Sequence, residues 1–271
     1  MSDALGDRMK GYYEDRTRVL LPRRSNLIIR VDGKAFHTFT RGMTRPFDPL
    51  FMQMMDETAK ALCEEVQGAK FGFVQSDEIS VWATDYDTLQ TDGWFGYDLR
   101  KICSVAASIA TAAFNRQHAL IQGPAMFDAR AFTIPSLTEV VNYFVWRQND
   151  ATRNSVSMAA QSQFSHKDLN GVSCDQMQEK LFREKGINWN DYPVGFKRGR
   201  GIVRVGKIQD VEYVDKRTGE KKIQKNVLRS SWEAVDPPVF TKDRYFIPRL
   251  APLTVRPAEP MGDMGVGGDG P

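Results

Sequence analysis

The stretch "FGFVQSDEISVW", residues 71–82, predicts two short strands joined by an acidic turn. Aromatic and β-branched residues on both sides of the turn favour buried strands over 71–75 and 79–83. Asp77 and Glu78 lie in the turn itself. Such a turn by itself is most simply a solvated connection, so its role depends on what the rest of the chain brings beside it.

The segments around this hairpin predict two further strands and two helices. "NLIIRVDG" (26–33) is apolar and β-branched and ends in Asp-Gly, which predicts the first strand. Asp48-Pro49 is typical of a helix start, and apolar residues continue at helical spacing to about residue 66. After the hairpin, "DLRKICSVAASIATAAFNRQ" (98–117) predicts a second helix and "FDARAFTIP" (127–135) a fourth strand.

The predicted order β-α-β-β-α-β is the split βαβ, or ferredoxin-like, unit. It implies an α+β fold with a four-stranded antiparallel sheet and two helices on one face. Polymerase palms are built on this unit, and so are many non-enzymatic modules, so topology alone does not assign a function. We expect a palm-like catalytic core over residues 1–135.

The remaining chain predicts additional helices and a β-rich C-terminal extension. A long helical region follows Pro135, and Ser173 and Gln176 have the capping-box spacing before another helix. Residues 197–232 alternate in a strand-like manner around a turn at Thr218-Gly219. We expect 136–250 to extend the same catalytic domain and the Pro/Gly-rich residues 251–271 to form a disordered tail.

Composition narrows the classes of protein only slightly. The 271 residues include 37 Lys and Arg against 34 Asp and Glu, a net charge of +3, so nucleic-acid binding would need local clusters of basic residues. Three cysteines without a CxxC pair suit neither a disulfide framework nor a zinc site, and Cys63 and Cys103 are predicted core residues. The sequence shows no signal peptide and no apolar run of roughly 18 residues, so we expect a cytoplasmic protein without a membrane segment.

The predicted topology brings three acidic residues to one end of the sheet. The first and third strands of the split βαβ unit are central neighbours, so Asp32 should lie near Asp77 and Glu78. Clustered carboxylates repel one another unless cations compensate them. Together with the carbonyl of Gly33, they are the hard oxygen ligands that Mg²⁺ prefers and that two-metal phosphoryl-transfer enzymes require. The sequence also allows the alternative that Asp32-Gly33 and residues 76–78 are two unrelated turns exposed to solvent.

Basic residues follow Asp32 in the chain. Lys34, His37, Arg41 and Arg45 lie in a predicted loop after the first strand, and Lys101 opens the second helix. Lysine and arginine beside a metal site suit a triphosphate, whose charge Mg²⁺ neutralises only in part. The alternative for each of them is a solvated surface.

Four segments, "RVDGKAFHTF", "QSDEIS", "FDARAF" and "YFVWRQND", together resemble the tRNA-His guanylyltransferase family. The resemblance is closer to its bacterial and phage guanylyltransferase-like branch of 3′-5′ polymerases, and it runs from about residue 5 to about residue 250. It implies a palm with two Mg²⁺ ions held by Asp32, Gly33 and Asp77, with Glu78 as a further catalytic carboxylate. It also implies a nucleotide and triphosphate site formed by Lys34, Ala35, Phe36, His37, Arg45, Ser76 and Lys101.

The resemblance further implies a reaction and its partners. A 5′-monophosphorylated RNA end is activated by ATP, and the 3′-hydroxyl of an incoming nucleotide, commonly GTP, then attacks the activated end. Both steps are in-line displacements at phosphorus, in which positioning and charge stabilisation dominate. The expected partners are tRNA, nucleoside triphosphates and further copies of the chain in a homotetramer.

The sequence departs from the family pattern after "WRQ". The tRNA-His-specific enzymes carry His-x-Asn-Asn there, whereas this chain carries Thr152-Arg153-Asn154-Ser155. The departure favours template-directed repair of 5′-truncated tRNA over obligatory guanosine addition to tRNA-His. The candidate RNA contacts are Arg147, Arg153 and Asn154, and Lys197, Arg198 and Arg200 of the basic segment "FKRGRG". A basic turn before a strand is the alternative for that segment.

Two other functions compete with this interpretation. Another palm enzyme, such as a nucleotidyl cyclase or cyclic-dinucleotide synthase, usually carries a GG(D/E)EF-type hairpin, whereas this one contains Gln75-Ser76-Asp77-Glu78. A non-catalytic RNA-binding relative would not need an acidic pocket facing a polyanion.

Overall fold

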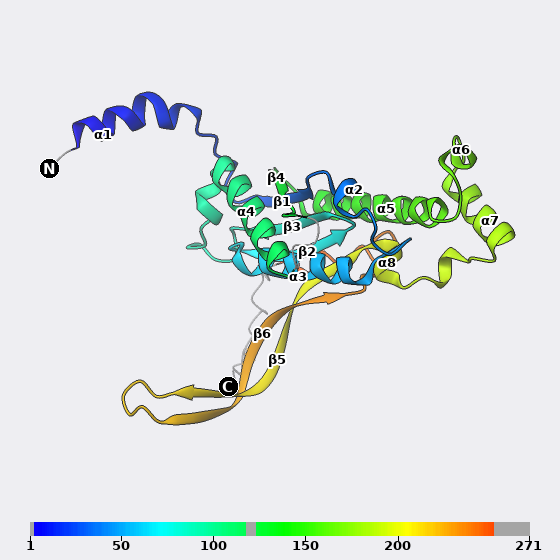
Figure 1. Cartoon of the computed structure of the whole chain (residues 1–271). Helices are drawn as coiled ribbons and strands as arrows, with labels where there is room; N and C mark the ends of the chain where they lie inside the picture. Colours follow the sequence, from blue (N-terminus) through cyan, green and yellow to red (C-terminus); the bar gives the residue numbers. More distant parts are fainter. Residues whose placement is uncertain (1–2, 118–122, 252–271) are drawn as a thin grey trace, which may run out of the picture.

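The structure, a computed structural model, describes residues 3–117 and 123–251 (Figure 1). In these residues the strands form one antiparallel sheet in the order β4-β1-β3-β2-β5-β6. The first four strands are β1 (Asn26–Gly33), β2 (Ala69–Gln75), β3 (Glu78–Thr84) and β4 (Phe127–Ile134). Their order and pairing confirm the predicted βαββαβ unit.

The two faces of the sheet bury alternate residues of each strand, as a period of two requires. In β1, Leu27, Ile29 and Val31 pack with α3 (Pro49–Glu65) and α4 (Leu99–Gln117) in one apolar core. Ile28 lies in the opposite core, which α5 (Leu137–Gln161) covers. The two predicted helices therefore lie on one face, and a third helix covers the other.

A short helix, α2 (Phe36–Phe39), occupies the segment that we expected to be a loop. Phe36 anchors it because its ring is 3% exposed and lies 5.0 Å from the ring of Phe127 and 5.6 Å from that of Phe114. A helix of four residues is too short to show helical periodicity, so sequence reasoning could not detect it.

Aromatic packing joins the region after residue 135 to the palm. Phe71 and Phe73 of β2 pack against Phe144 of α5, with centroid separations of 5.0 and 6.3 Å, and against Phe240. The C-terminal part of α5 belongs to a further apolar cluster with α6 (His166–Leu169), α7 (Cys174–Lys185) and Trp189. The capping box predicted at Ser173 is present at the start of α7.

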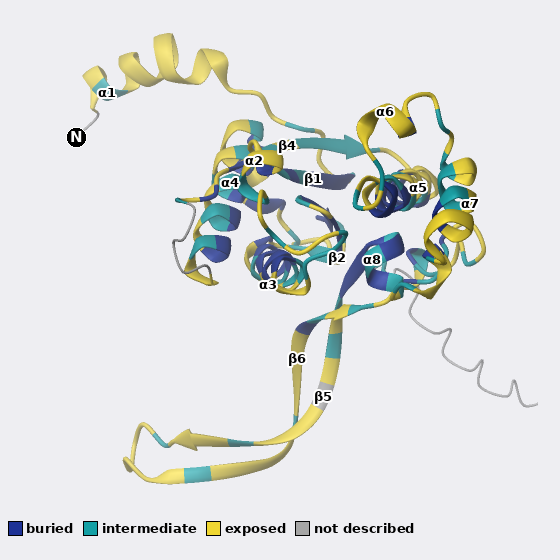
Figure 2. Ribbon diagram, turned by 45° about the vertical axis from the view of Figure 1, so that its right-hand side comes forward, coloured by how far each residue is buried: buried dark blue, intermediate teal, exposed yellow. Residues whose placement is uncertain are grey.

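Strands β5 (Arg200–Val214) and β6 (Lys221–Val235) form a long hairpin. Its base extends the sheet where 200–202 pair with β2, while the remainder projects from the body as an arm (Figures 1 and 2). The predicted turn at Thr218-Gly219 is confirmed. The first residues, in α1 (Ala4–Met9) and the turns Lys10–Glu14 and Asp15–Thr17, also extend outward and bury no residue.

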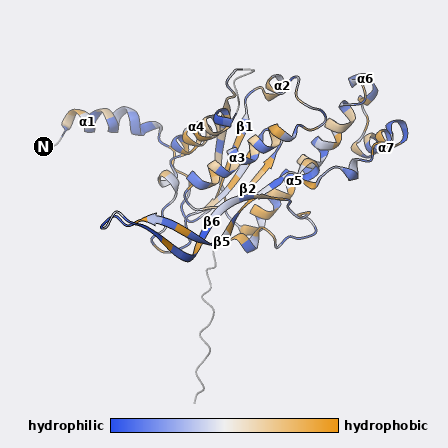
Figure 3. Ribbon diagram, turned by 60° about the horizontal axis from the view of Figure 1, so that its bottom comes forward, coloured by the Kyte–Doolittle hydropathy of each residue, from blue (hydrophilic) through white to orange (hydrophobic). Residues whose placement is uncertain are grey.

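The remaining elements are short: α8 (Val194–Arg198) and the single turns Trp94–Tyr97, Trp189–Asp191 and Pro248–Leu250. Figure 3 shows hydrophobic residues concentrated in the central strands. Cys63 is buried as predicted, but Cys103 is only half-buried, because it is not among the residues of α4 that face the core. None of the described helices has the length and apolar character to cross a membrane. The predicted disordered tail, apart from residue 251, lies outside the described residues.

Phe144 provides a test of the aromatic core between α5 and the sheet. The substitution Phe144→Ala should lower the free energy of unfolding by about 3–5 kcal/mol, because it leaves a cavity beside Phe71 and Phe73. Urea denaturation followed by circular dichroism measures the change. Phe182→Ala, at a 60% exposed position of α7, is the control and should change stability by about 0.5 kcal/mol or less. Equal effects of the two substitutions would contradict this packing.

Candidate active site

Backbone pairing brings the acidic residues together. In the β1–β3 ladder Asp32 lies opposite Glu78, and the N–H of Gly33 donates to the carbonyl of Asp77 at 3.1 Å. Residues 45 positions apart in the chain therefore meet at one end of the sheet, as the topology predicted. Asp32 and Asp77 are half-buried, whereas Glu78 is buried.

The acids differ in how their charge is balanced. Glu78 binds Arg147 at 2.8 Å and lies 3.6 Å from Nε of Arg30. Neither Asp32 nor Asp77 forms an ion pair with any residue in the described ranges. Burial raises the pKa of Asp77 above its ordinary value, and the charges of Asp32 and Glu78 raise this pKa further. The carboxylates of Asp32 and Asp77 therefore repel each other, and no ion pair with a basic side chain in the described residues offsets this repulsion.

The carboxylates of Asp32 and Asp77 suit Mg²⁺ better than they suit a metal ion whose ligands all come from the protein. Within residues 3–117 and 123–251, no group of three or more His, Cys, Asp or Glu side chains could hold a metal ion. Mg²⁺, however, usually binds through one or two carboxylates and takes its other ligands from water and substrate phosphates. Asp32 and Asp77 supply such a pair of carboxylates.

Backbone geometry explains the residue types beside the acids. A Cβ added at Gly33 would lie 2.3 Å from the ring of Phe36, so the residue after Asp32 has no room for a side chain. Ser76 opens a two-residue turn between Gln75 and Glu78 and has φ 46°, in the left-handed region. Ala35 has φ 57°. Such conformations of non-glycine residues are strained and concentrate at functional sites.

A cleft next to the acids collects three of the residues predicted to bind nucleotide. His37, Arg45 and Ser76 line this cleft, which has a cavity volume of about 310 Å³. It lies between α2, the loop that follows it, the strained turn and the C-terminal half of α5. The other residues that line it are Thr40, Met43, Thr44, Pro46, Asp48, Phe51, Met158 and Gln161.

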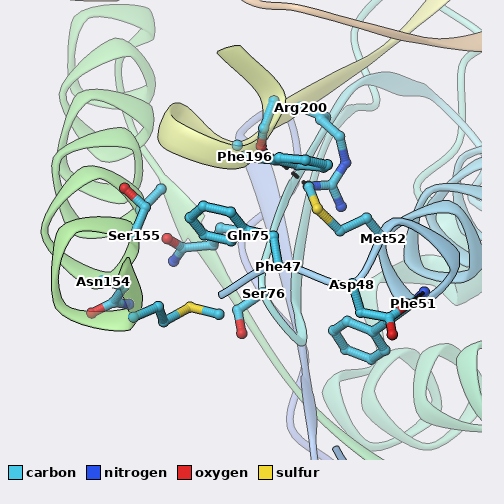
Figure 4. A pocket seen from close by; sticks show the side chains of 14 residues that line it. Phe47, Asp48, Phe51, Met52, Gln75, Ser76, Asn154, Ser155, Phe196 and Arg200 are labelled. Carbon is cyan, nitrogen blue, oxygen red and sulfur yellow. Dashed lines mark hydrogen bonds between the residues drawn. The ribbon is translucent and has the colours of Figure 1, made fainter. Parts of the chain in front are cut away.

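A second pocket, shown in Figure 4, shares Asp48, Phe51, Ser76 and Met158 with the cleft. It has a cavity volume of only about 60 Å³ and is largely apolar, with Phe47, Met52 and Phe196 in its wall. Asn154 of α5 also lines it. The wall also contains Gln75, which no sequence pattern marked, and Arg200, a predicted RNA contact. Their buried Oε1 and Nη2 atoms find no hydrogen-bond partner in the described part of the chain.

Other residues predicted for the nucleotide site lie differently. Lys34 and Ala35 are exposed beside the acids, but the ring of Phe36 is buried in the core and cannot contact a ligand. Lys101 lies at the opposite end of the sheet, because α4 begins where the N–H of Leu99 binds the carbonyl of Val19, ahead of β1. The prediction that Lys101 reaches the acidic residues of its own chain is therefore wrong.

The structure also separates the candidate RNA contacts. Arg153 and Asn154 are exposed on α5, as an RNA contact requires. Arg147 is only 4% exposed and points to Glu78, so a direct contact to RNA is not available to it. Ser155 is buried and donates to the carbonyl of Lys197, which gives it a packing role.

The basic segment "FKRGRG" does not form the predicted surface patch. Lys197 is buried and donates to the carbonyl of Asn190 at 2.5 Å, and Arg200 is buried in an ion pair with Asp56. Arg198 is half-buried and lies 5.6 Å from the ring of Trp189. These side chains attach α8 and the start of β5 to their neighbours, and contacts so distant in sequence cannot be inferred from a run of charges.

Comparison with known proteins identifies the family. A profile of the tRNAHis guanylyltransferase family matches residues 6–135. A solved bacterial tRNA(His) guanylyltransferase-like protein in complex with ATP is 41% identical, has a TM-score of 0.78, and the match covers 91% of this chain and 99% of that one. The corresponding GTP complex is also 41% identical, with a TM-score of 0.73 and coverage of 92% and 99%.

A more distant relative has the same name. The tRNA(His) guanylyltransferase of Saccharomyces cerevisiae is 28% identical over 217 residues, which are 72% of this chain and 89% of the yeast protein. With the paired acids, the adjoining cleft and the 41% identical structures, these similarities lead to one conclusion. The chain belongs to the tRNAHis guanylyltransferase family and is a nucleotidyltransferase of its bacterial guanylyltransferase-like branch.

Proposed function

We propose that the chain is a Mg²⁺-dependent 3′-5′ nucleotidyltransferase that adds nucleotides to the 5′ end of tRNA. The observation that carries the proposal is the pair of carboxylates, Asp32 and Asp77, that lack an ion-pair partner in the described residues and lie beside a cleft lined by His37 and Arg45. The ATP and GTP complexes of the 41% identical relative support nucleoside triphosphates as substrates.

In this proposal Asp32, Asp77 and the carbonyl of Gly33 hold Mg²⁺. The ions, when bound, would neutralise phosphate charge and polarise the phosphorus that is attacked. We do not assign Glu78 as one of these ligands, because its carboxylate is buried and is paired with Arg147.

The cleft residues bind the triphosphate. Arg45 and His37 lie on its wall and can donate hydrogen bonds to phosphate oxygens, and Ser76 offers a hydroxyl where the cleft meets the acidic turn. Lys34 is exposed directly after the Asp32-Gly33 pair and adds a positive charge. Fixed donors around a developing negative charge need no reorganisation during the reaction, and this is how such sites accelerate phosphoryl transfer.

Arg153 and Asn154 would contact the RNA 5′ end. They lie on the exposed side of α5, with Asn154 in the pocket that adjoins the cleft at Ser76. Thr152 donates to the carbonyl of Gln148 within the helix and replaces the histidine of the tRNA-His-specific enzymes. We therefore favour repair of 5′-truncated tRNA, after activation of the 5′-monophosphate by ATP, over obligatory addition of guanosine. The homotetramer and the cytoplasmic location stay predictions.

Removing either free carboxylate tests the proposal. Asp32→Asn and Asp77→Asn should each lower the rate by about 100-fold or more, because charge stabilisation at the reacting phosphate is lost. The assay is extension of 5′-monophosphorylated, 5′-truncated tRNA with ATP, GTP and Mg²⁺. Asp175→Asn, at an exposed position of α7, is the matched control. Wild-type rates in both acid variants, or no extension by the wild-type protein, would refute the proposed function.

Arg45→Met separates nucleotide binding from RNA binding. We expect the KM for the nucleoside triphosphate to rise by about 10-fold or more, since a hydrogen bond from a charged group contributes about 1.5–3 kcal/mol. The KM for tRNA should change little, because Arg45 lines the cleft and does not line the pocket that contains Asn154. Separate titrations of the two substrates measure this, with Arg116→Met on the exposed face of α4 as the control. An increase confined to the KM for tRNA would contradict this placement.

A further inference from the structure

The guanidinium of Arg147 is buried, and its terminal nitrogens both bind protein carboxylates. Its Nη1 donates to both oxygens of Glu78 at 2.8 and 3.2 Å, and its Nη2 donates to Asp150 at 2.8 Å. The guanidinium also lies over the ring of Trp146, 3.8 Å from the centroid. Only Nε lacks a partner in the described part of the chain, and it is buried.

Glu78 receives these bonds at the base of the strained turn. Gln75 and Glu78 are cross-strand partners, and Nε2 of Gln75 donates to the Glu78 carboxylate at 3.2 Å. Ser76 and Asp77 form the turn between them, with Ser76 at φ 46°. A strained backbone persists only where its surroundings over-determine it, and the bonds to Glu78 supply that constraint.

A second contact joins α5 to β3 beside the Arg147–Glu78 contact. The hydroxyls of Tyr143 and Ser80 lie 2.7 Å apart and are buried. Tyr143 precedes Arg147 by one helical turn, and Ser80 follows Glu78 by two residues on the same face of the strand. The helix is therefore attached to β3 at two successive positions, of which the Arg147–Glu78 contact is the one nearer to Asp77.

The ion pairs of this group do not include Asp32 or Asp77. Glu78 pairs with Arg30 and Arg147, and Asp150 pairs with Arg147 and Arg153. Because Asp77 directly precedes Glu78 and its carbonyl accepts from Gly33, any displacement of Glu78 also moves Asp77 relative to Asp32.

We propose that Arg147 and Glu78 are a buried pair of positioning residues that fixes the turn carrying Asp77. Arg147 then acts on the reaction through Glu78 and makes no contact with RNA. The inference concerns the reaction given under the proposed function and rests on it, but the placement of Asp77 can be measured without that reaction.

Three variants test the pair. Arg147→Met leaves Glu78 buried with one partner fewer and is expected to lower the melting temperature, since breaking one side of a buried pair leaves an uncompensated charge. Arg147→Lys keeps the charge but not the two-pronged geometry. The double variant E78Q/R147M removes both charges, so its melting temperature should recover toward that of the wild-type protein.

The kinetic expectation differs from the stability expectation. All three variants should lower kcat by about 10- to 100-fold, the range found when a group that orients a metal ligand is lost. The Mg²⁺ concentration for half-maximal rate should rise, and calorimetry with Mn²⁺ and a nucleoside triphosphate should show a matching loss of metal affinity. Affinity for tRNA in EDTA should stay within about twofold. The double variant should be no slower than Arg147→Met, because residues that act as one unit are not additive.

Arg183→Met is the matched control. Arg183 is exposed on α7 and pairs with Glu179 one turn earlier, so the same substitution there should leave kcat, metal affinity and melting temperature unchanged. A loss of tRNA affinity with unchanged kcat in Arg147→Met would overturn the proposal in favour of direct RNA contact. Recovery of kcat together with melting temperature in the double variant would overturn it in favour of a purely structural role. If the wild-type protein extends no tRNA, the proposed function fails, and unchanged or weakened Mn²⁺ affinity in the variants still decides whether the pair positions Asp77.

Discussion

The antiparallel pairing of β1 with β3 fixes the positions of the acidic residues at the proposed site. It sets Asp32 opposite Glu78 and leaves the Gly33 N–H free to bind the carbonyl of Asp77. Because side chains alternate between the two faces, a slip of one residue would turn the Asp32 carboxylate into the apolar core. The same register buries Leu27, Ile29 and Val31, so the hydrophobic core and the acidic edge depend on one set of backbone hydrogen bonds.

Three neighbouring carboxylates take different roles because their partners differ. Glu78 is neutralised by arginines from β1 and α5, whereas Asp32 and Asp77 have no basic partner in the described residues. The sequence predicts that the three acids lie together, because strand order follows from hydrophobic patterning. It does not predict which acid has a basic partner, because the partner of Glu78, Arg147, lies 69 positions further along the chain.

The strands, the main helices and the acidic edge could be predicted because each has a local signal: alternation, helical spacing, Asp48-Pro49 or Ser173 as a helix start. The errors concern long side chains whose surroundings come from distant segments. Arg200 binds Asp56 across 144 positions, and Lys101 lies far from the acids because α4 begins near the start of β1. Exposure of a basic residue is a tertiary property, and a run of charges does not determine it.

Helix α5 spans the molecule from the sheet to the cluster formed with α6 and α7. At about 1.5 Å per residue, its 25 residues extend about 37 Å. One uninterrupted helix carries Arg147 beneath the acidic turn, Asn154 at the adjoining pocket and, near its end, the groups that hold α7. The helix therefore fixes the distance between the acidic turn and the α6–α7 end. A substrate that contacts both must span that distance.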